Sequence, residues 1–173
     1  NKVFEVVEAK KIFNLSYKNI SILVHPKSYV HAILKFKNGL TKIIVHDTNM
    51  KIPIFNSLYS SNNSISSKRL DLEILNNLKF QKINYNRFPL IKILNKLPEH
   101  SSLYETILVS INDQLVDLFL DNKIKFTDIS QKMHNILDLK ELKKYRMKKK
   151  YNINDILALN NEIKIKVKSL INK

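Results

Sequence analysis

The stretch LYETILVSINDQLVDLF, residues 103–119, is the clearest fold signal in this chain. Its apolar side chains recur every three or four residues, which places them on one side of an α-helix. Three further segments, 88–97, 129–137 and 156–170, repeat that spacing with short connections between them. Four amphipathic helices that each need a buried partner predict a small helical bundle over residues 85–173. The inward positions in the longest segment are Leu103, Ile107, Ile111, Leu115, Leu118 and Phe119.

Capping residues mark where two of these helices should begin. Thr127 is the expected N-cap of the third segment, and Asn152 or Asn154 is the expected N-cap of the last. The predicted inward residues of these two helices are Ile129, Met133, Ile136, Leu137, Ile156, Leu159, Ile163, Val167 and Leu170.

The first half of the chain predicts a helix followed by strands. Residues 2–13 form the helix, with Val3, Val6, Val7 and, less cleanly, Phe13 on one side. The short apolar run 20–26 and the alternating run 29–36 read as strands, and 41–45 is the return strand after an Asn-Gly turn at 37–39. We therefore expect an α+β protein in which the helix packs on a small, mostly antiparallel sheet of three strands, or on a larger sheet to which these strands belong.

Residues 57–69 show no periodicity and are mostly Ser and Asn, which is typical of a linker or loop. We predict three parts: a first part over 1–57 that holds the helix and the sheet, a linker over 58–84 and the helical bundle over 85–173.

The composition limits the classes of function. The net charge is +15, which by itself suggests nucleic acid or an anionic surface, and the run 140–151 is strongly basic with two Tyr. The excess is spread over both halves of the chain, and the basic run has no RNA-binding signature, so nucleic acid is not the expected partner. The absence of Cys excludes disulfides and thiolate metal sites, and no apolar run is long enough to span a membrane.

The first helical turn carries Asn1, Lys2 and Glu5, spaced so that their side chains can meet on one side. A helix N-terminus favours anions, so Asn1 and Lys2 could donate to phosphate oxygens. Glu5 offers hard oxygen ligands for Mg²⁺ or Mn²⁺. The alternative is an ordinary solvated helix start, and the spacing alone leaves both readings open.

Histidines and glycines give weaker signals. His25 and His31 bracket Pro26, so a metal pair is doubtful and a hydrogen-bonded structural histidine is the commoner outcome. His46, His100 and His134 are isolated and receive no role, and Met50 is expected in the core or lining a pocket. A single Gly cannot build a glycine-rich phosphate loop.

Several stretches together resemble 1-deoxy-D-xylulose 5-phosphate reductoisomerase. NKVFEVVEAKKIF (1–13) is similar to the "NKGLE…IEA" helix of that family, ILVHPKSYVHAILKFKNG (22–39) to its "HPQSxxH" segment and hairpin, and NMKIPI (49–54) to its "DMRxPI". FPLIKIL (88–94) and NKIKFTDI (122–129) resemble landmarks of its C-terminal helical region. The order and spacing agree over essentially all 173 residues.

The resemblance implies the C-terminal part of a longer enzyme whose NADPH-binding domain and two further metal ligands lie upstream. That enzyme converts 1-deoxy-D-xylulose 5-phosphate to 2-C-methyl-D-erythritol 4-phosphate with NADPH and Mn²⁺ or Mg²⁺. Asn1 and Lys2 match the substrate-binding pair, and Glu5 matches a metal ligand that also approaches the substrate. Ser28, His31 and Met50 match positions near the active site, as pocket or supporting residues.

The resemblance also implies that residues 1–57 are the C-terminal part of a catalytic and dimerisation domain, with a homodimer formed through the hairpin sheet. The sequence shows no eukaryotic cue, so we expect a bacterial cytoplasm, with a plastid-type organelle as the alternative. The isolated chain is expected to be inactive. Three departures from the family pattern stand out: Val3 stands where the family usually has Gly, HDTNMKIPI (46–54) stands where it has Gly-x-Pro-Asp, and Tyr59 lies near the place where a Trp is common. The other hypotheses are a basic RNA-binding module and a noncatalytic dimerisation module.

Overall fold

The computed structural model describes residues 1–60, 62–69, 71–147 and 151–171. The chain divides into two compact units: residues 1–21 with 84–173, called here the helical unit, and residues 22–83, called the hairpin unit. Each unit is described by itself. The predicted boundaries at 57 and 84 stay a prediction. By packing alone, the first helix belongs with the C-terminal helices, because Val3 is buried in their core.

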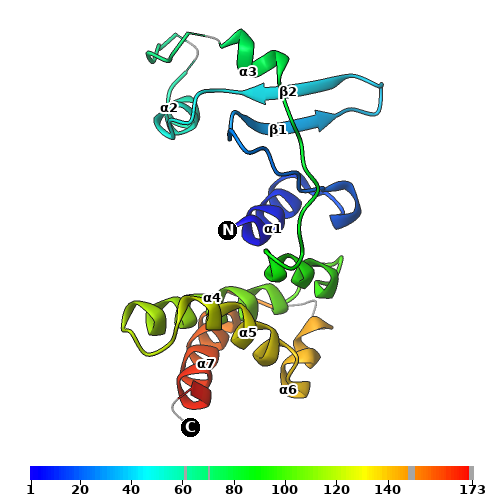
Figure 1. The fold of residues 1–173 in the computed structure, drawn as a ribbon. Helices are drawn as coiled ribbons and strands as arrows, with labels where there is room; N and C mark the ends of the chain where they lie inside the picture. The colour runs from blue at the N-terminus through cyan, green and yellow to red at the C-terminus, as the bar shows by residue number, and fades with distance from the viewer. Residues whose placement is uncertain (61, 70, 148–150, 172–173) are drawn as a thin grey trace. The chain divides into compact units, whose positions relative to one another are not determined.

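The helical unit is made of α-helices joined by short 3₁₀ segments (Figure 1). Its elements in chain order are α1 (Lys2–Phe13), η1 (Tyr17–Asn19), η2 (Pro89–Lys96), α4 (Tyr104–Leu120), α5 (Phe126–Leu137), α6 (Lys140–Lys143), η3 (Lys144–Arg146) and α7 (Ile153–Ile171). The segment 88–97, predicted as an α-helix, is the 3₁₀ segment η2.

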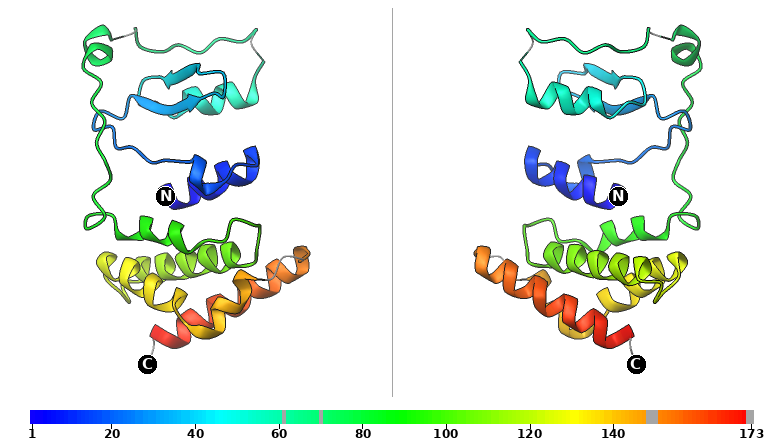
Figure 2. Two further views of the ribbon diagram at one scale, coloured as in Figure 1. Left: turned by 90° about the vertical axis from the view of Figure 1, so that its right-hand side faces the viewer. Right: turned by 90° about the vertical axis from the view of Figure 1, so that its left-hand side faces the viewer.

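Helix α4 lies at the centre of this unit and packs against α5, α6 and α7 (Figure 2). The predicted stripe of α4 is almost completely buried, and Phe119 at its end is partly buried; the fully buried members are Leu103, Ile107, Ile111, Leu115 and Leu118. The predicted inward residues of α5 are buried as well. In α7, Leu159, Ile163 and Val167 are buried, but Leu170 is 40% exposed, so the buried stripe ends one turn earlier than predicted.

Helix α1 packs on η2. Val3 and Val6 are buried as predicted, and the helix ends at Asn14, which adopts the left-handed conformation at φ 50°. The prediction that Phe13 faces inward is wrong, since its side chain is 70% exposed. In the last turn of α1, Lys10 makes a hydrogen bond and Lys11 an ion pair with other parts of the helical unit.

The capping predictions were half right. Asn152 caps α7: its side-chain oxygen accepts the N–H of Asp155 at 3.0 Å, and its own N–H donates to the Asp155 carboxylate at 2.9 Å. This is the reciprocal pattern of a capping box. The prediction for Thr127 is wrong, because α5 begins at Phe126 and Thr127 lies inside the first turn. Asp128 accepts the N–H of Lys125 at 2.9 Å there instead.

The hairpin unit contains strands β1 (Val30–Lys35) and β2 (Thr41–Val45), which pair antiparallel, and helices α2 (Lys51–Leu58) and α3 (Leu72–Asn76). The α+β class is therefore confirmed. The strand predicted over 20–26 is wrong: within the described residues, only Val24 pairs there, in an isolated bridge with Gln81. Pro26 opens a turn in which the Ser28 N–H donates to the His25 carbonyl at 2.9 Å, so the chain cannot continue as a strand.

The hairpin turn uses Gly39 at φ 87°, while Asn38 keeps a negative φ. The Gly39 N–H donates to the Phe36 carbonyl at 3.1 Å, and the Phe36 N–H donates to the Leu40 carbonyl at 2.8 Å. This is a type I turn closed by a left-handed glycine, rather than the two-residue Asn-Gly turn that the sequence suggested.

Helices α2 and α3 were not predicted. Pro53 was taken as the end of a segment, but it occupies the third position of α2, where a helix does not need the missing N–H. The expected loop 57–69 is confirmed only after α2 ends at Leu58, since the described residues from Tyr59 to Arg69 contain no helix or strand.

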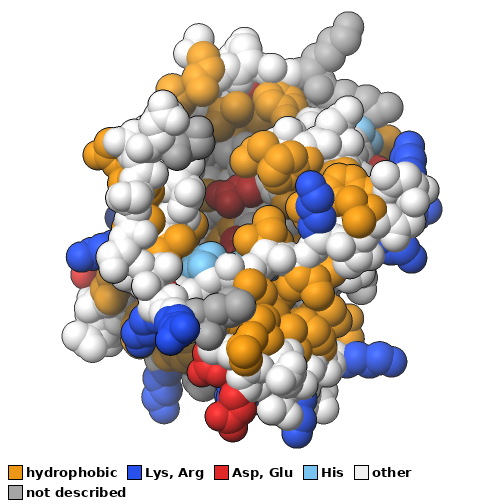
Figure 3. Space-filling model, turned by 90° about the horizontal axis from the view of Figure 1, so that it is seen from above, with side chains coloured by type: hydrophobic (Ala, Val, Ile, Leu, Met, Phe, Trp, Pro, Cys, Tyr) orange, Lys and Arg blue, Asp and Glu red, His pale blue; other side chains and the backbone are white. Residues whose placement is uncertain are grey.

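Both faces of the hairpin carry exposed apolar side chains: Ile33, Leu34, Phe36, Leu40, Ile43 and Ile44. The space-filling view shows hydrophobic side chains at the surface beside scattered Lys and Arg (Figure 3).

Within the described residues, none of the helices combines the length and apolar character that crossing a membrane requires.

The core of the helical unit can be tested with two isoleucines on α7. Ile163 is fully buried, whereas Ile165 is 69% exposed. We expect Ile163→Ala to lower the free energy of unfolding by about 2–5 kcal/mol, because it leaves a cavity against α4. Ile165→Ala, the matched control, should change it by less than about 0.5 kcal/mol. Urea denaturation followed by circular dichroism measures both, and equal effects would contradict the packing described here.

Candidate functional site

The first turn of α1 presents polar groups to solvent. Asn1 is the N-cap, and its carbonyl accepts the N–H of Glu5 at 3.0 Å, but its side chain makes no capping bond. The Lys2 ammonium pairs with the Glu5 carboxylate, and all three side chains are exposed. The structure thus brings Lys2 and Glu5 into contact at the positive end of the helix dipole.

This turn fits a divalent cation only as the source of one ligand. Glu5 provides a hard, accessible carboxylate of the kind that Mg²⁺ and Mn²⁺ prefer. Among the described residues, however, no group of three His, Cys, Asp or Glu side chains lies close enough to hold a metal ion. A cation bound at Glu5 would therefore need further ligands from outside these residues.

The chain does not contain the glycine-rich turn of the usual dinucleotide site. The only glycine in the chain is Gly39, and it serves the hairpin turn. A dinucleotide site of the usual kind needs a glycine-rich turn that leads into a helix, which one glycine used elsewhere cannot supply.

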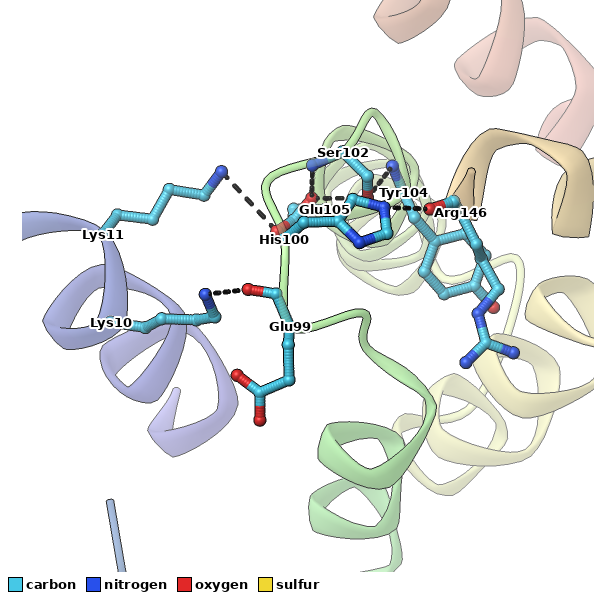
Figure 4. Close-up of polar contacts among 8 residues, drawn as sticks. All are labelled: Lys10, Lys11, Glu99, His100, Ser102, Tyr104, Glu105 and Arg146. Carbon is cyan, nitrogen blue, oxygen red and sulfur yellow. Dashed lines mark hydrogen bonds and ion pairs between the residues drawn. The ribbon is translucent and has the colours of Figure 1, made fainter. Parts of the chain in front are cut away.

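Four residues hold the opposite end of α1 against the start of α4 and the segment before it. They are Lys10, Lys11, Glu99 and Glu105, called here the α1 anchor. Lys10 donates to the backbone carbonyl of Glu99 (Figure 4). The Glu99 carboxylate accepts the Ser16 hydroxyl at 3.0 Å and the Tyr17 N–H at 3.2 Å. One glutamate therefore binds the end of α1 and the turn that follows it.

Glu105 is the buried member of the α1 anchor, with 6% of its surface exposed. Its carboxylate accepts the Ser102 N–H at 3.0 Å and the Ser102 hydroxyl at 2.9 Å, and it lies 3.5 Å from the Lys11 ammonium. Figure 4 shows both lysines reaching from α1 toward this segment. A buried carboxylate with these partners fixes α1 to the start of α4, since losing them would leave its charge buried without compensation.

Part of the basic run 140–151 is used for packing. Arg146 lies over the Tyr104 ring at 5.6 Å, and its carbonyl accepts His100 Nε2 at 2.9 Å (Figure 4). Glu141 pairs with Lys166 of α7. Residues 148–150 lie outside the described residues. What is described of the run shows contacts within the helical unit and adds no support for an RNA-binding role.

In the hairpin unit, Ser28 has an unusual backbone. Its φ is 51°, a left-handed conformation that is uncommon for residues other than glycine. His25, at the start of the same turn, donates from Nδ1 to the Lys79 carbonyl at 3.0 Å, which agrees with the prediction of a hydrogen-bonded structural histidine. Strained positions of this kind gather at functional sites, so Ser28 keeps its place among the candidates.

His31 lies at a β-bulge. The pairing passes from Val30–Val45 to Ala32–Ile44, so β1 contains one extra residue at His31. The regular alternation predicted for 29–36 is therefore broken at this residue. Its ring stacks on the ring of His46, with 3.5 Å between centroids and 4° between planes. Bulges re-aim side chains and are frequent beside active sites.

Met50 directly precedes α2 and is 64% exposed, so it is not a core residue. The segment that leads to it is held by Asp47, whose carboxylate accepts the Lys68 N–H at 2.9 Å and the Asn49 N–H at 3.3 Å. The bond from Lys68 lowers the pKa of Asp47 below its usual value.

The six predicted site residues fall into two groups: Asn1, Lys2 and Glu5 in the helical unit, and Ser28, His31 and Met50 in the hairpin unit. A cavity of about 380 Å³ in the helical unit contains none of them; it is lined by Gln114, Asp117, Leu118, Leu120, Asp121, Lys123 and Lys168. Sequence reasoning missed His46 and Glu105. His46 could have been noticed because it directly follows a strand that pairs with the His31 strand.

Known proteins provide the context for these residues. A sequence model of the DXP reductoisomerase C-terminal domain matches residues 46–166. The 1-deoxy-D-xylulose 5-phosphate reductoisomerase of Pelagibacter ubique (strain HTCC1062) is 56% identical over 171 residues, which cover 98% of this chain and 44% of that protein. The enzyme of the same name from Sulfurihydrogenibium sp. (strain YO3AOP1) is 34% identical over 92% of this chain and 41% of its own length.

Solved structures agree. A crystal structure of DOX-P reductoisomerase in complex with NADPH, fosmidomycin and magnesium superposes with a TM-score of 0.84 at 26% identity, over 99% of this chain and 43% of that one. The reductoisomerase from Zymomonas mobilis in complex with NADPH gives a TM-score of 0.79 at 25% identity, over 100% of this chain and 45% of that one. This chain thus spans less than half the length of the relatives it matches.

Tyr17, beside the α1 anchor, allows a test by pH. Its hydroxyl is buried and lacks a hydrogen-bond partner among the described residues. Burial, with the charges of Glu105 and Glu99, raises the pKa of Tyr17 above its ordinary value. The unfolded chain therefore ionises first, and the Tyr17 contribution to stability is lost as pH rises past about 10.

We expect the free energy of unfolding of the wild type to fall more steeply above pH 10 than that of Tyr17→Phe. Urea denaturation at several pH values measures the difference. Tyr85→Phe is the matched control, because the Tyr85 side chain is exposed. Identical pH profiles for the wild type and Tyr17→Phe would show that Tyr17 is not buried beside these carboxylates.

Proposed function

This chain belongs to the DXP reductoisomerase C-terminal domain family, and on that premise we propose that it is the C-terminal part of an NADPH-dependent reductoisomerase. The reaction is the conversion of 1-deoxy-D-xylulose 5-phosphate to 2-C-methyl-D-erythritol 4-phosphate, in non-mevalonate isoprenoid synthesis. The observation that carries the proposal is the 56% identity to a curated reductoisomerase over 98% of this chain. The solved relatives in complex with NADPH and magnesium support the choice of cofactors.

In this proposal, the first turn of α1 binds substrate and cation. Asn1 and Lys2 donate to the sugar phosphate at the positive end of the helix dipole, and Glu5 provides one ligand for the cation. When bound, Mg²⁺ or Mn²⁺ stabilises negative charge on substrate oxygens. The exposure of all three side chains supports this role, because groups that receive a ligand must be reachable.

The α1 anchor gives this turn a fixed support. Lys10 and Lys11 bind the far end of the same helix to Glu99 and to the buried Glu105. A 12-residue helix held at one end by the anchor and along its side by η2 carries its first turn as a rigid extension. Groups held in place by packed elements bind with less loss of entropy than groups on a free segment.

In the hairpin unit, Ser28, His31 and Met50 are the residues that we propose as pocket or supporting residues of the full enzyme. The left-handed backbone of Ser28 and the bulge at His31 support this assignment, since both features are costly and tend to persist where function needs them. The exposure of Met50 agrees with a contact to substrate rather than with a place in the core.

The exposed hairpin also favours a homodimer. A two-stranded sheet is marginal alone, and this one leaves apolar side chains exposed on both faces. A second copy of the chain would cover these side chains. Sedimentation equilibrium should give twice the chain mass for the wild type and a lower mass for Ile43→Lys. A wild type that stays monomeric at micromolar concentration would refute the dimer.

The matched relatives come from bacteria, so we place the enzyme in a bacterial cytoplasm.

Glu5 provides the direct test of the site. In the full enzyme that contains this chain, Glu5→Gln keeps the shape of the side chain but removes its charge. We expect kcat/KM to fall by on the order of a hundredfold or more, since losing even a partner of a metal ligand costs about 10- to 100-fold. Steady-state NADPH oxidation at saturating Mg²⁺ measures the loss.

Glu8→Gln is the matched control, because Glu8 is exposed on the same helix one turn away; its activity should equal that of the wild type. The purified 173-residue chain is a second control, and we expect it to show no turnover, because its single glycine cannot supply the glycine-rich turn of the usual NADPH site. If Glu5→Gln and Glu8→Gln retain equal activity, Glu5 is not a metal ligand. Turnover by the isolated chain would disprove the dependence on further domains.

A further inference from the structure

The contact between His31 and His46 is not explained by the strand pairing alone. The two rings stack nearly parallel at 3.5 Å, although one residue lies in β1 and the other directly follows β2. At this separation, the face of one imidazole is covered by the other over most of its area. Rings this close are in van der Waals contact, so each restricts rotation about the side-chain bonds of the other.

We propose that His46 is a positioning residue that sets the plane of the His31 imidazole in the substrate pocket. This inference rests on the proposed function, in which His31 is a pocket or supporting residue. His46 acts through His31 and need not touch the substrate.

The backbone brings the two rings together in two steps. The His46 N–H donates to the Tyr29 carbonyl at 3.4 Å, which continues the hairpin pairing one residue beyond β2. The bulge adds one residue to β1 at His31 and so turns its side chain away from the regular alternation.

The far side of the stack is also held. His46 Nδ1 donates to the Asp47 carbonyl, which fixes the orientation of the His46 ring. The Asp47 carboxylate is bound in turn by the N–H groups of Lys68 and Asn49. His46 is therefore a fixed surface on which the His31 ring rests.

The stack is tested first on the 173-residue chain by proton NMR of its five histidines. The His31 ring protons, assigned by their loss in His31→Asn, should lie upfield, because the His46 ring current shields them. We expect His46→Ala to move them downfield and His46→Phe to keep them upfield, since phenylalanine also offers a flat ring. His134→Gln is the matched control and should leave them in place, because His134 lies on α5 in the other unit.

The His25 resonances report whether the hairpin unit stays folded, because His25 is held there by the Lys79 carbonyl. If His46→Ala also moves the His25 resonances, that variant has disturbed the hairpin unit. The stack is then judged from the spectra of the wild type and His46→Phe. Wild-type His31 protons at unshifted positions would overturn the stack and, with it, the inference, while leaving the proposed function intact.

Activity of the full enzyme tests the role. We expect His46→Ala to lower kcat/KM by on the order of tenfold to a hundredfold, the cost of a small misplacement at a reacting centre, and His46→Phe to restore most of the loss. A shielded His31 combined with unchanged activity in His46→Ala would refute positioning. A wild-type enzyme with no activity on the sugar phosphate would instead overturn the proposed function, and the role of His46 with it.

Discussion

Burial of one face of α4 is the constraint on which the helical unit depends. The residues Ile107, Ile111 and Leu115 are fully buried, and the helices that cover them, α5 and α7, come from chain on the C-terminal side of α4. Each of those helices is amphipathic and would be unstable in water by itself. The helical unit is therefore stabilised because α5 and α7 bury the apolar face of α4 and α4 buries theirs.

The charged and hydrogen-bonded contacts of α1 fix its placement, which the apolar core alone does not. Hydrophobic burial would allow α1 to slide along η2, because it has no preferred orientation. The pairing of Lys11 with the buried Glu105, and the three bonds made by Glu99 and its backbone carbonyl, have defined donors and acceptors. They select one placement of α1 and so set where its first turn lies within the unit.

The hairpin unit depends on local backbone geometry more than on a core. Its strands are short, and most of its apolar side chains remain exposed. What defines it are three backbone features: the left-handed Gly39, the left-handed Ser28 and the bulge at His31. Two of the three coincide with residues that the sequence resemblance had placed near the active site, which is where strained backbone is expected to persist.

The sequence by itself determined the α4 stripe, the ends of α1, the N-cap of α7 and the presence of a hairpin, because helical period, capping and turn chemistry act over a few neighbouring positions. The six proposed site residues rest on spacing and on the family resemblance, and they stay a proposal. It did not determine the fate of Phe13 and Leu170, which depends on where a neighbouring element ends. Only the tertiary structure decided that Glu105 holds α1 and that His46 rests on His31. These contacts join residues far apart in the chain or across a bulge, and no local spacing encodes such distances.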